Sequence, residues 1–169
     1  LGTSSDDGAQ GVTVDSSDNI YVTGRTNGDL DGNTNTGNYD IFLVKYNSSG
    51  TKQWTKQLGT SSHDYGRGVT VDSSDNIYVT GETSGGLDGN TNSGDYDLFL
   101  VKYNPSGKKP STYKQGTSAT EYGHAVSVDA SDVIHVTGMT GGGLAGYTIS
   151  GAYAIVPVKY HAPGNKPAS

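Results

Sequence analysis

The sequence has 169 residues, of which 31% are hydrophobic and 26 are glycine, and this turn-rich composition excludes a helical bundle. The net charge of −6 argues against nucleic acid as a partner, because binding to a phosphate backbone depends on clustered lysine and arginine. Cysteine is absent, which excludes disulfides, thiolate metal sites and a cysteine nucleophile.

The dominant feature of the chain is a repeat of 57 residues. The segment LGTSSDDGAQGVTVDSSDNIYVTG, which begins at Leu1, recurs as LGTSSHDYGRGVTVDSSDNIYVTG at Leu58 and more loosely as QGTSATEYGHAVSVDASDVIHVTG at Gln115. Fixed self-similarity of this kind indicates a repeat architecture. We divide the chain into repeats 1–57, 58–114 and 115–169, the last of them divergent and ending before its final strand is complete.

Each repeat is predicted to form four short antiparallel strands. In the first repeat, residues 11–15 (GVTVD) and 19–23 (NIYVT) are β-branched runs separated by the turn residues Ser-Ser-Asp, which predicts a hairpin. A loop rich in glycine, asparagine and aspartate follows. The most apolar run, residues 39–46 (YDIFLVKY), then turns through NSSG into the fourth strand at 51–58.

This pattern is typical of a β-propeller, in which four-stranded sheets called blades pack face to face around an axis. In the third strand, Ile41 and Leu43 share one face while Phe42 and Val44 share the other. Both faces are therefore apolar, as expected of a strand between two neighbouring blades. A parallel β-helix is the alternative, although its rungs are usually shorter than this period. The fold class that we expect is all-β, with three tandem blades.

The repeats also resemble the bacterial β-propeller repeat family known as SBBP. The hallmark of that family runs through a GDD-like start, a G(V/I)xVD segment, N(I/V)YVTG and a later FLVKY strand, and all three repeats of this sequence match it. The third repeat is the weakest match, with Ile134, His135 and Val156 at positions where the first repeat has Ile20, Tyr21 and Phe42. The resemblance implies a module of a large exported protein.

Three blades do not close a propeller, which usually has about four to eight. We therefore expect either a portion of a longer protein with more blades or an association of identical chains. In the second case two chains would form one six-bladed ring, and the leading residues of one would add a strand to the last blade of the other.

The loop between the second and third strands is a candidate calcium site in the first two repeats. Side-chain oxygens recur at alternate positions on a glycine-containing loop, which suits a hard cation that takes six to eight oxygen ligands. The alternative is a tight surface loop held by side-chain-to-backbone hydrogen bonds. The aligned residues of the third repeat, Ala145, Tyr147, Ile149, Ala152 and Ala154, cannot form such a site. The candidate ligands are Asp29, Asp31, Asn33, Asn35 and Asp40 in the first repeat and Asp88, Asn90, Asn92, Asp95 and Asp97 in the second.

Acidic residues near the start of each repeat, Asp7, Asp64 and Glu121, are candidates for a ligand site at one end of the central channel, where the chain enters the innermost strand. Solvated loop acids are the alternative. The equivalent tyrosines Tyr39, Tyr96 and Tyr153 are expected to pack between blades, with stacking on a sugar as the alternative.

The sequence contains no G-x-S-x-G, G-x-x-x-x-G-K-[ST] or H-E-x-x-H motif, and its polar groups recur regularly. We therefore expect a non-enzymatic, extracellular or cell-surface propeller module for scaffolding, adhesion or assembly. The expected partners are other blades, a second copy of the chain, a surface protein or a glycan. No apolar stretch approaches the roughly 20 residues needed to cross a bilayer. A carbohydrate-binding propeller and a calcium-assisted propeller hydrolase are the alternative functions.

Overall fold

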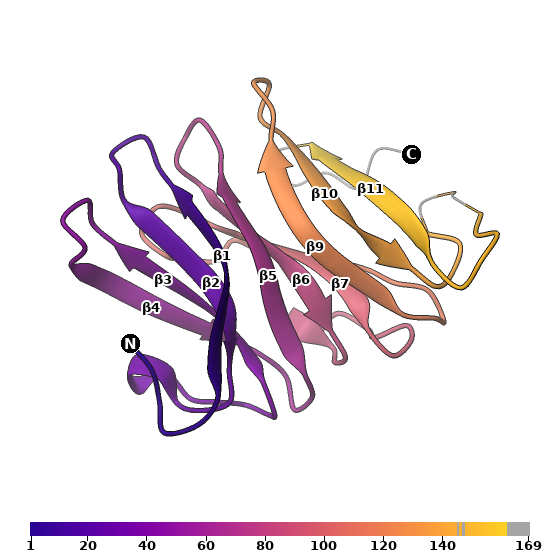
Figure 1. The fold of residues 1–169 in the computed structure, drawn as a ribbon, viewed down its shortest axis with the longest axis horizontal. Helices are drawn as coiled ribbons and strands as arrows, with labels where there is room; N and C mark the ends of the chain where they lie inside the picture. The colour runs from indigo at the N-terminus through magenta and orange to yellow at the C-terminus, as the bar shows by residue number, and fades with distance from the viewer. Residues whose placement is uncertain (145, 147, 162–169) are drawn as a thin grey trace.

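A computed structural model describes residues 1–144, 146 and 148–161 of the chain. Its strands form antiparallel sheets that follow one another across the molecule in chain order (Figure 1). We call the sheets blade 1, blade 2 and blade 3. Blade 1 consists of β1 (Asp7–Val14), β2 (Ile20–Thr26), β3 (Asp40–Tyr46) and β4 (Lys52–Leu58).

Blade 2 repeats the strand order of blade 1, and blade 3 is described for its first three strands. The predicted fourth strand of the third repeat falls in residues 162–169, outside the described residues. Blade 2 consists of β5 (Asp64–Val71), β6 (Ile77–Thr83), β7 (Asp97–Tyr103) and β8 (Ser111–Gln115), and blade 3 of β9 (Glu121–Val128), β10 (Val133–Thr140) and β11 (Ala154–His161).

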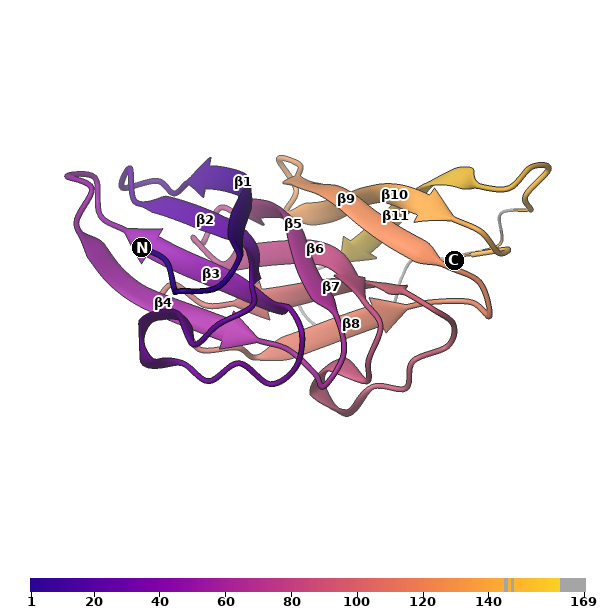
Figure 2. The same ribbon diagram turned by 60° about the horizontal axis from the view of Figure 1, so that its bottom comes forward.

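The all-β fold class and the propeller-like blades are confirmed. In each complete sheet every strand pairs with the next one along the chain, which is the meander that the alternating sequence predicted. The first strands of the blades, β1, β5 and β9, lie next to one another (Figures 1 and 2). The described sheets do not close into a ring, so they form part of a propeller.

The first strand of each blade begins earlier than predicted. β1 starts at Asp7 because its backbone pairs with the end of β2, from Asp7 opposite Thr26 to Val14 opposite Ile20. A register shift between Ala9 and Gly11 lies within this pairing, and β5 has the same irregularity. Glycine and aspartate are poor strand formers, so propensity alone did not indicate this extension.

The predicted hairpin turn at residues 15–19 is confirmed, and Asp15 organises it. Its carboxylate accepts hydrogen bonds from the backbone N–H groups of Ser17 and Asn19, both at 2.9 Å, and from the Tyr21 hydroxyl at 3.0 Å. Burial opposes ionisation, but these hydrogen bonds together lower the pKa of Asp15. Asp18 turns the chain with a φ of 60°, a conformation that aspartate tolerates better than most residues.

The hydrophobic core lies between blades. One face of blade 1 packs on blade 2, and the opposite face of blade 2 packs on blade 3. Phe99 and Val101 of β7 thus contact blade 1, while Leu98 and Leu100 of the same strand contact blade 3. This arrangement explains why both faces of the third strand are apolar.

Candidate functional site

The two predicted calcium loops contain acids that are already paired with lysines of their own blade. Asp31 forms an ion pair with Lys52, and the Thr55 hydroxyl donates to its other oxygen at 2.7 Å. The Lys52 hydrogen bond, followed by the Thr55 hydrogen bond, lowers the pKa of Asp31. In blade 2, Asp88 has the equivalent contacts with Lys109 and Thr112.

The asparagines of these loops make backbone hydrogen bonds. The side-chain amides of Asn33 and Asn90 donate to the carbonyls of Leu30 and Leu87, at 2.8 and 2.7 Å. Asx-type bonds of this kind hold a short 3-10 turn at Leu30–Gly32 and again at Leu87–Gly89.

The two other acids of the blade 1 loop, Asp29 and Asp40, also have protein partners. The Asn35 backbone N–H donates to Asp29 Oδ1 at 2.8 Å. Asp40 is buried and accepts from the Thr36 backbone N–H and from the Gln57 side-chain amide, both at 3.0 Å. These bonds anchor the loop to the start of β3 and to β4.

In blade 2 a lysine takes the place of Gln57. Lys114 forms a buried ion pair with Asp97 at 2.7 Å and donates to Asn92 Oδ1 at 2.8 Å, while Asp95 is exposed. Within the described ranges, no three acidic or histidine side chains are close enough to share a metal ion. In the third repeat Ala145 and Tyr147 lie outside those ranges, and calcium binding in the first two stays a prediction.

The predicted channel acids stand at the first residue of each inner strand, but they point into the blade. Asp64 and Glu121 are fully buried, whereas Asp7 is partly exposed. Asp64 accepts hydrogen bonds from the backbone N–H and hydroxyl of Thr60, at 2.6 and 2.9 Å, and from the Thr83 hydroxyl. Burial raises the pKa of Asp64.

The other two acids make the same contacts. Glu121 binds Thr117 and Thr140 as Asp64 binds its two threonines. Asp7 likewise binds Thr3 and Thr26. We call this contact the acid–threonine lock. It ties the loop before each inner strand to the end of the next strand.

Beside the acid–threonine locks lies a continuous row of aromatic rings that crosses all three blades. Successive centroids along it are separated by 5.6, 6.1, 5.8 and 6.4 Å, which is the range of favourable ring contacts. Two positions of the repeat contribute: the residue just before the third strand, and a residue on the inner strand. We call this set the tyrosine row: Tyr39, Tyr65, Tyr96, Tyr122 and Tyr153.

Two arginines and a buried glutamate accompany the row at its blade 1 end. The Arg25 guanidinium lies 5.2 Å from the Tyr39 centroid and 5.5 Å from that of Tyr65. Arg67 lies 5.3 Å from the Tyr65 centroid, and its Nε donates to Glu82 Oε1 at 2.8 Å. Such contacts stabilise a cation over a ring. Among the described residues Arg25 forms no direct ion pair, although its charge acts on Glu82, and its Nε is buried without a hydrogen-bond partner.

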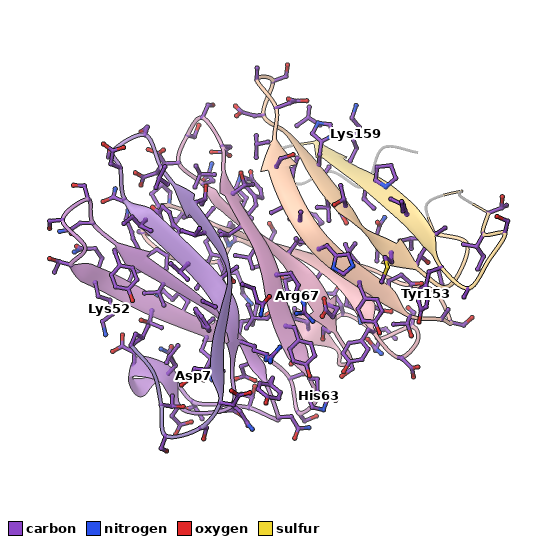
Figure 3. The ribbon with its side chains drawn as sticks, in the orientation of Figure 1. Asp7, Lys52, His63, Arg67, Tyr153 and Lys159 are labelled. Carbon is purple, nitrogen blue, oxygen red and sulfur yellow. The ribbon has the colours of Figure 1, made fainter. Side chains whose placement is uncertain are left out.

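Glu82 is only 1% exposed, and its second oxygen, Oε2, has no hydrogen-bond partner in the described structure. Burial raises the pKa of Glu82, although the hydrogen bond and charge of Arg67 oppose that rise. Figure 3 shows Arg67 on β5 and His63 just before that strand, with Tyr153 farther along the molecule beyond β9.

The hydroxyls at the same end are held by neighbouring polar groups. The Tyr39 hydroxyl donates to Asp6 Oδ2 at 2.8 Å, and the Tyr65 hydroxyl is hydrogen-bonded to His63 Nδ1 at 3.1 Å. Burial raises the pKa of Tyr96 to about 12. Four rings of the row are partly exposed, and the fifth, Tyr153, is 52% exposed.

The charged residues at the blade 1 end of the row, together with Tyr65, occupy positions where the first two repeats differ. The first two repeats are identical at most core positions, but Gly8 of blade 1 corresponds to Tyr65, and Arg25 corresponds to Glu82. Likewise Gln10 corresponds to Arg67. These residues were not predicted from the sequence, because the prediction was based on residues that recur in every repeat. The signal that could have indicated them is a large chemical difference between two repeats that are otherwise nearly identical.

The equivalent tyrosines Tyr39, Tyr96 and Tyr153 were predicted to pack between blades. Tyr39 and Tyr96 do contact a ring of the neighbouring blade, whereas Tyr153 contacts Tyr122 of its own blade. The tyrosines at the ends of the third strands behave differently. Tyr103 and Tyr160 are buried in the cores between blades, with 4% and 2% of their surface exposed.

A second feature is the face of blade 1 that no other blade covers, which we call the open face. An open hollow of about 300 Å³ lies on it. Val12 and Val14 are 68% and 53% exposed there, whereas Val69, the counterpart of Val12 in blade 2, is 8% exposed. The hollow is lined chiefly by Leu1, Val22, Leu30, Phe42, Val44 and Tyr46.

Comparison with known proteins yields a family and one distant relative. Residues 1–31 and 53–88 match the family described as beta-propeller repeat, SBBP. An uncharacterized WD repeat-containing protein of Acanthamoeba polyphaga mimivirus is 28% identical over 129 residues. That match covers 64% of this chain and 9% of the relative. None of the described helices is long and apolar enough to span a bilayer.

Proposed function

Because residues 1–31 and 53–88 are β-propeller repeats of the SBBP family, we propose that the chain is a binding module and not an enzyme. It serves in scaffolding, adhesion or assembly outside the cell or at its surface, and it binds a protein partner at the tyrosine row. The gathering of Arg25, Arg67 and Tyr65 at one end of the row supports this proposal. Tyrosine and arginine are the residues most enriched where protein partners bind strongly.

The state of Glu82 supports a binding role over a catalytic one. A general acid or base must reach the proton that it transfers. Glu82 is 1% exposed and ion-paired with Arg67, so its carboxylate positions the arginine beneath the row. The surface offered to a partner then consists of the partly exposed tyrosines of the row and of Arg25, which is also partly exposed.

Labelled protein incubated with intact, unpermeabilised cells of the source organism tests this role. We expect saturable binding, and we expect Arg25→Gln to weaken it about tenfold or more, since a hydrogen-bonded charge at an interface contributes about 1.5–3 kcal/mol. Lys108→Gln is the matched control, because it removes one positive charge from an exposed turn of blade 2. Equal binding by all three proteins, or none by the unmodified chain, contradicts the proposal.

Tyr153 favours carbohydrate as the second candidate ligand. Its ring ends the row and is 52% exposed, so it offers the kind of aromatic surface on which a sugar can stack. A glycan array tests this function. Binding to defined glycans supports a lectin if the Tyr153→Ala substitution abolishes that binding, and an array without any signal rules the lectin function out.

Calcium binding by the loops of blades 1 and 2 is the remaining part of the proposal. The oxygens of Asp31 and Asp88 lie on tight turns, but a bound cation would have to displace Lys52 and Lys109. We expect the melting temperature to be higher in calcium than in EDTA if the loops bind the ion, since a ligand of the folded state stabilises it. The double variant Asp31→Ala, Asp88→Ala must lose that difference. Equal melting temperatures in both buffers end the calcium hypothesis.

A further inference from the structure

Neighbouring blades are joined through their hairpin turns by a pair of hydrogen bonds, which we call the turn clamp. The Ser16 backbone N–H donates to Asp75 Oδ1 at 3.0 Å, and the Ser16 hydroxyl donates to Asp75 Oδ2 at 2.9 Å. Ser73 and Asp132 form the same pair between blades 2 and 3, at 3.0 and 2.6 Å. Each clamp therefore needs a serine on one blade and an aspartate on the next.

Half of a third clamp is already formed on blade 1. Asp18 corresponds to Asp75 and Asp132, and it has the same left-handed backbone, with a φ of 60° against 58° and 57°. Its side chain is exposed, and it makes no hydrogen bond with any described residue. The acceptor is thus in position before any serine reaches it.

The apolar surface beside Asp18 is the open face. On blade 2 the corresponding residues, which include Val69 and Phe99, are covered by Tyr21, Ile41 and Leu43 of blade 1. Blade 2 covers the same surface of blade 3 through Tyr78, Leu98 and Leu100. The same surface therefore recurs on three blades, with a partner on two of them.

The opposite side of the molecule differs at three of the four matching positions and keeps an aliphatic residue, Ile155, at the fourth. Blade 3 has Ala130 at the position of Ser16 and Ser73, so it has no hydroxyl for a clamp. His135 replaces the covering tyrosine and is bound to Asp129 at 2.9 Å, and Pro157 replaces the covering leucine. Ile155 on this side is 83% exposed.

We propose that the open face of blade 1 docks a further blade of this repeat type through a third turn clamp, and that any blade on the far side of blade 3 docks without one. The incoming blade supplies a serine at the position of Ser16, which donates to Asp18, and a tyrosine and two aliphatic side chains that cover the open face. The two ends of the chain thus differ in how they join a neighbouring blade. This inference is independent of the ligand proposed for the tyrosine row.

The test is a fusion in which a second copy of residues 1–57 is joined directly ahead of Leu1, which keeps the spacing between consecutive repeats. We expect its melting temperature to exceed that of the original chain by roughly 5 °C or more, because the fusion buries the open face. Ser16→Ala with Tyr21→His, made only in the added copy, gives it two blade 3 residues and should remove most of the gain. An unchanged melting temperature, or an equal gain from the altered copy, overturns the proposal.

Substitutions in the original chain test the clamp without relying on the fusion. Asp75→Asn should lower the melting temperature, whereas Asp18→Asn should leave it unchanged, because only the first residue has a serine partner. In the fusion, Asp18→Asn of the original blade should become destabilising. If Asp75→Asn and Asp18→Asn have equal effects in the original chain, the clamp contributes nothing and the proposal fails.

Discussion

Replacing Phe99 by alanine is expected to lower the free energy of unfolding by about 3–5 kcal/mol. The Phe99 ring is fully buried in the core between blades 1 and 2, so its removal leaves a cavity that two sheets must share. For a protein of this size the melting temperature should fall by roughly 6–20 °C. Urea unfolding followed by far-ultraviolet circular dichroism measures the change.

Phe42→Ala is the matched control for that experiment. Phe42 holds the same position in blade 1, but it lies in a small cluster of its own blade, with Leu30 and Val44, beside the hollow of the open face. Its removal should cost clearly less than the removal of Phe99, since no second sheet packs over it. Equal costs would show that packing between blades adds nothing to packing within a blade.

Gly81→Ala is expected to be comparably damaging, by about 3 kcal/mol or more, for a steric reason. A Cβ atom at Gly81 would lie 1.8 Å from the Tyr65 carbonyl oxygen, and a backbone atom cannot rotate away. The inner strand β5 would have to separate from β6 next to its register shift. Thermal melting should show the loss.

Gly8→Ala is the control, since a Cβ atom there meets no other atom within 4 Å. Its effect should stay within about 0.5 kcal/mol. A tolerated Gly81→Ala would mean that β5 and β6 are packed less closely than the structure shows.

The blade architecture was predictable because it depends on local, repeated signals. Two of these signals lie within one repeat: the turn residues between the first two strands and the apolar third strand. Together with the 57-residue period they indicated a four-stranded meander. The early start of β1 at Asp7 was not predictable from propensity, because backbone pairing with β2 maintains it.

The tyrosine row was predictable only in part, because it depends on how blades lie relative to one another. Tyr39 and Tyr65 are 26 positions apart in the chain, yet their ring centroids are 5.6 Å apart. Likewise, nothing in the alternation of Asp31, Asn33 and Asn35 indicates that Lys52 of the fourth strand will form an ion pair with Asp31. Contacts between elements, and not the composition of one loop, decided both outcomes.

The acid–threonine lock has a consequence for how such chains evolve. Thr60, Asp64 and Thr83 all belong to one 57-residue period, so a duplicated period carries its own complete lock. Genes for such proteins can therefore gain or lose whole periods by unequal recombination without leaving a buried carboxylate unpaired. An insertion between Thr60 and Asp64 would instead separate the acid from one of its hydrogen-bond donors.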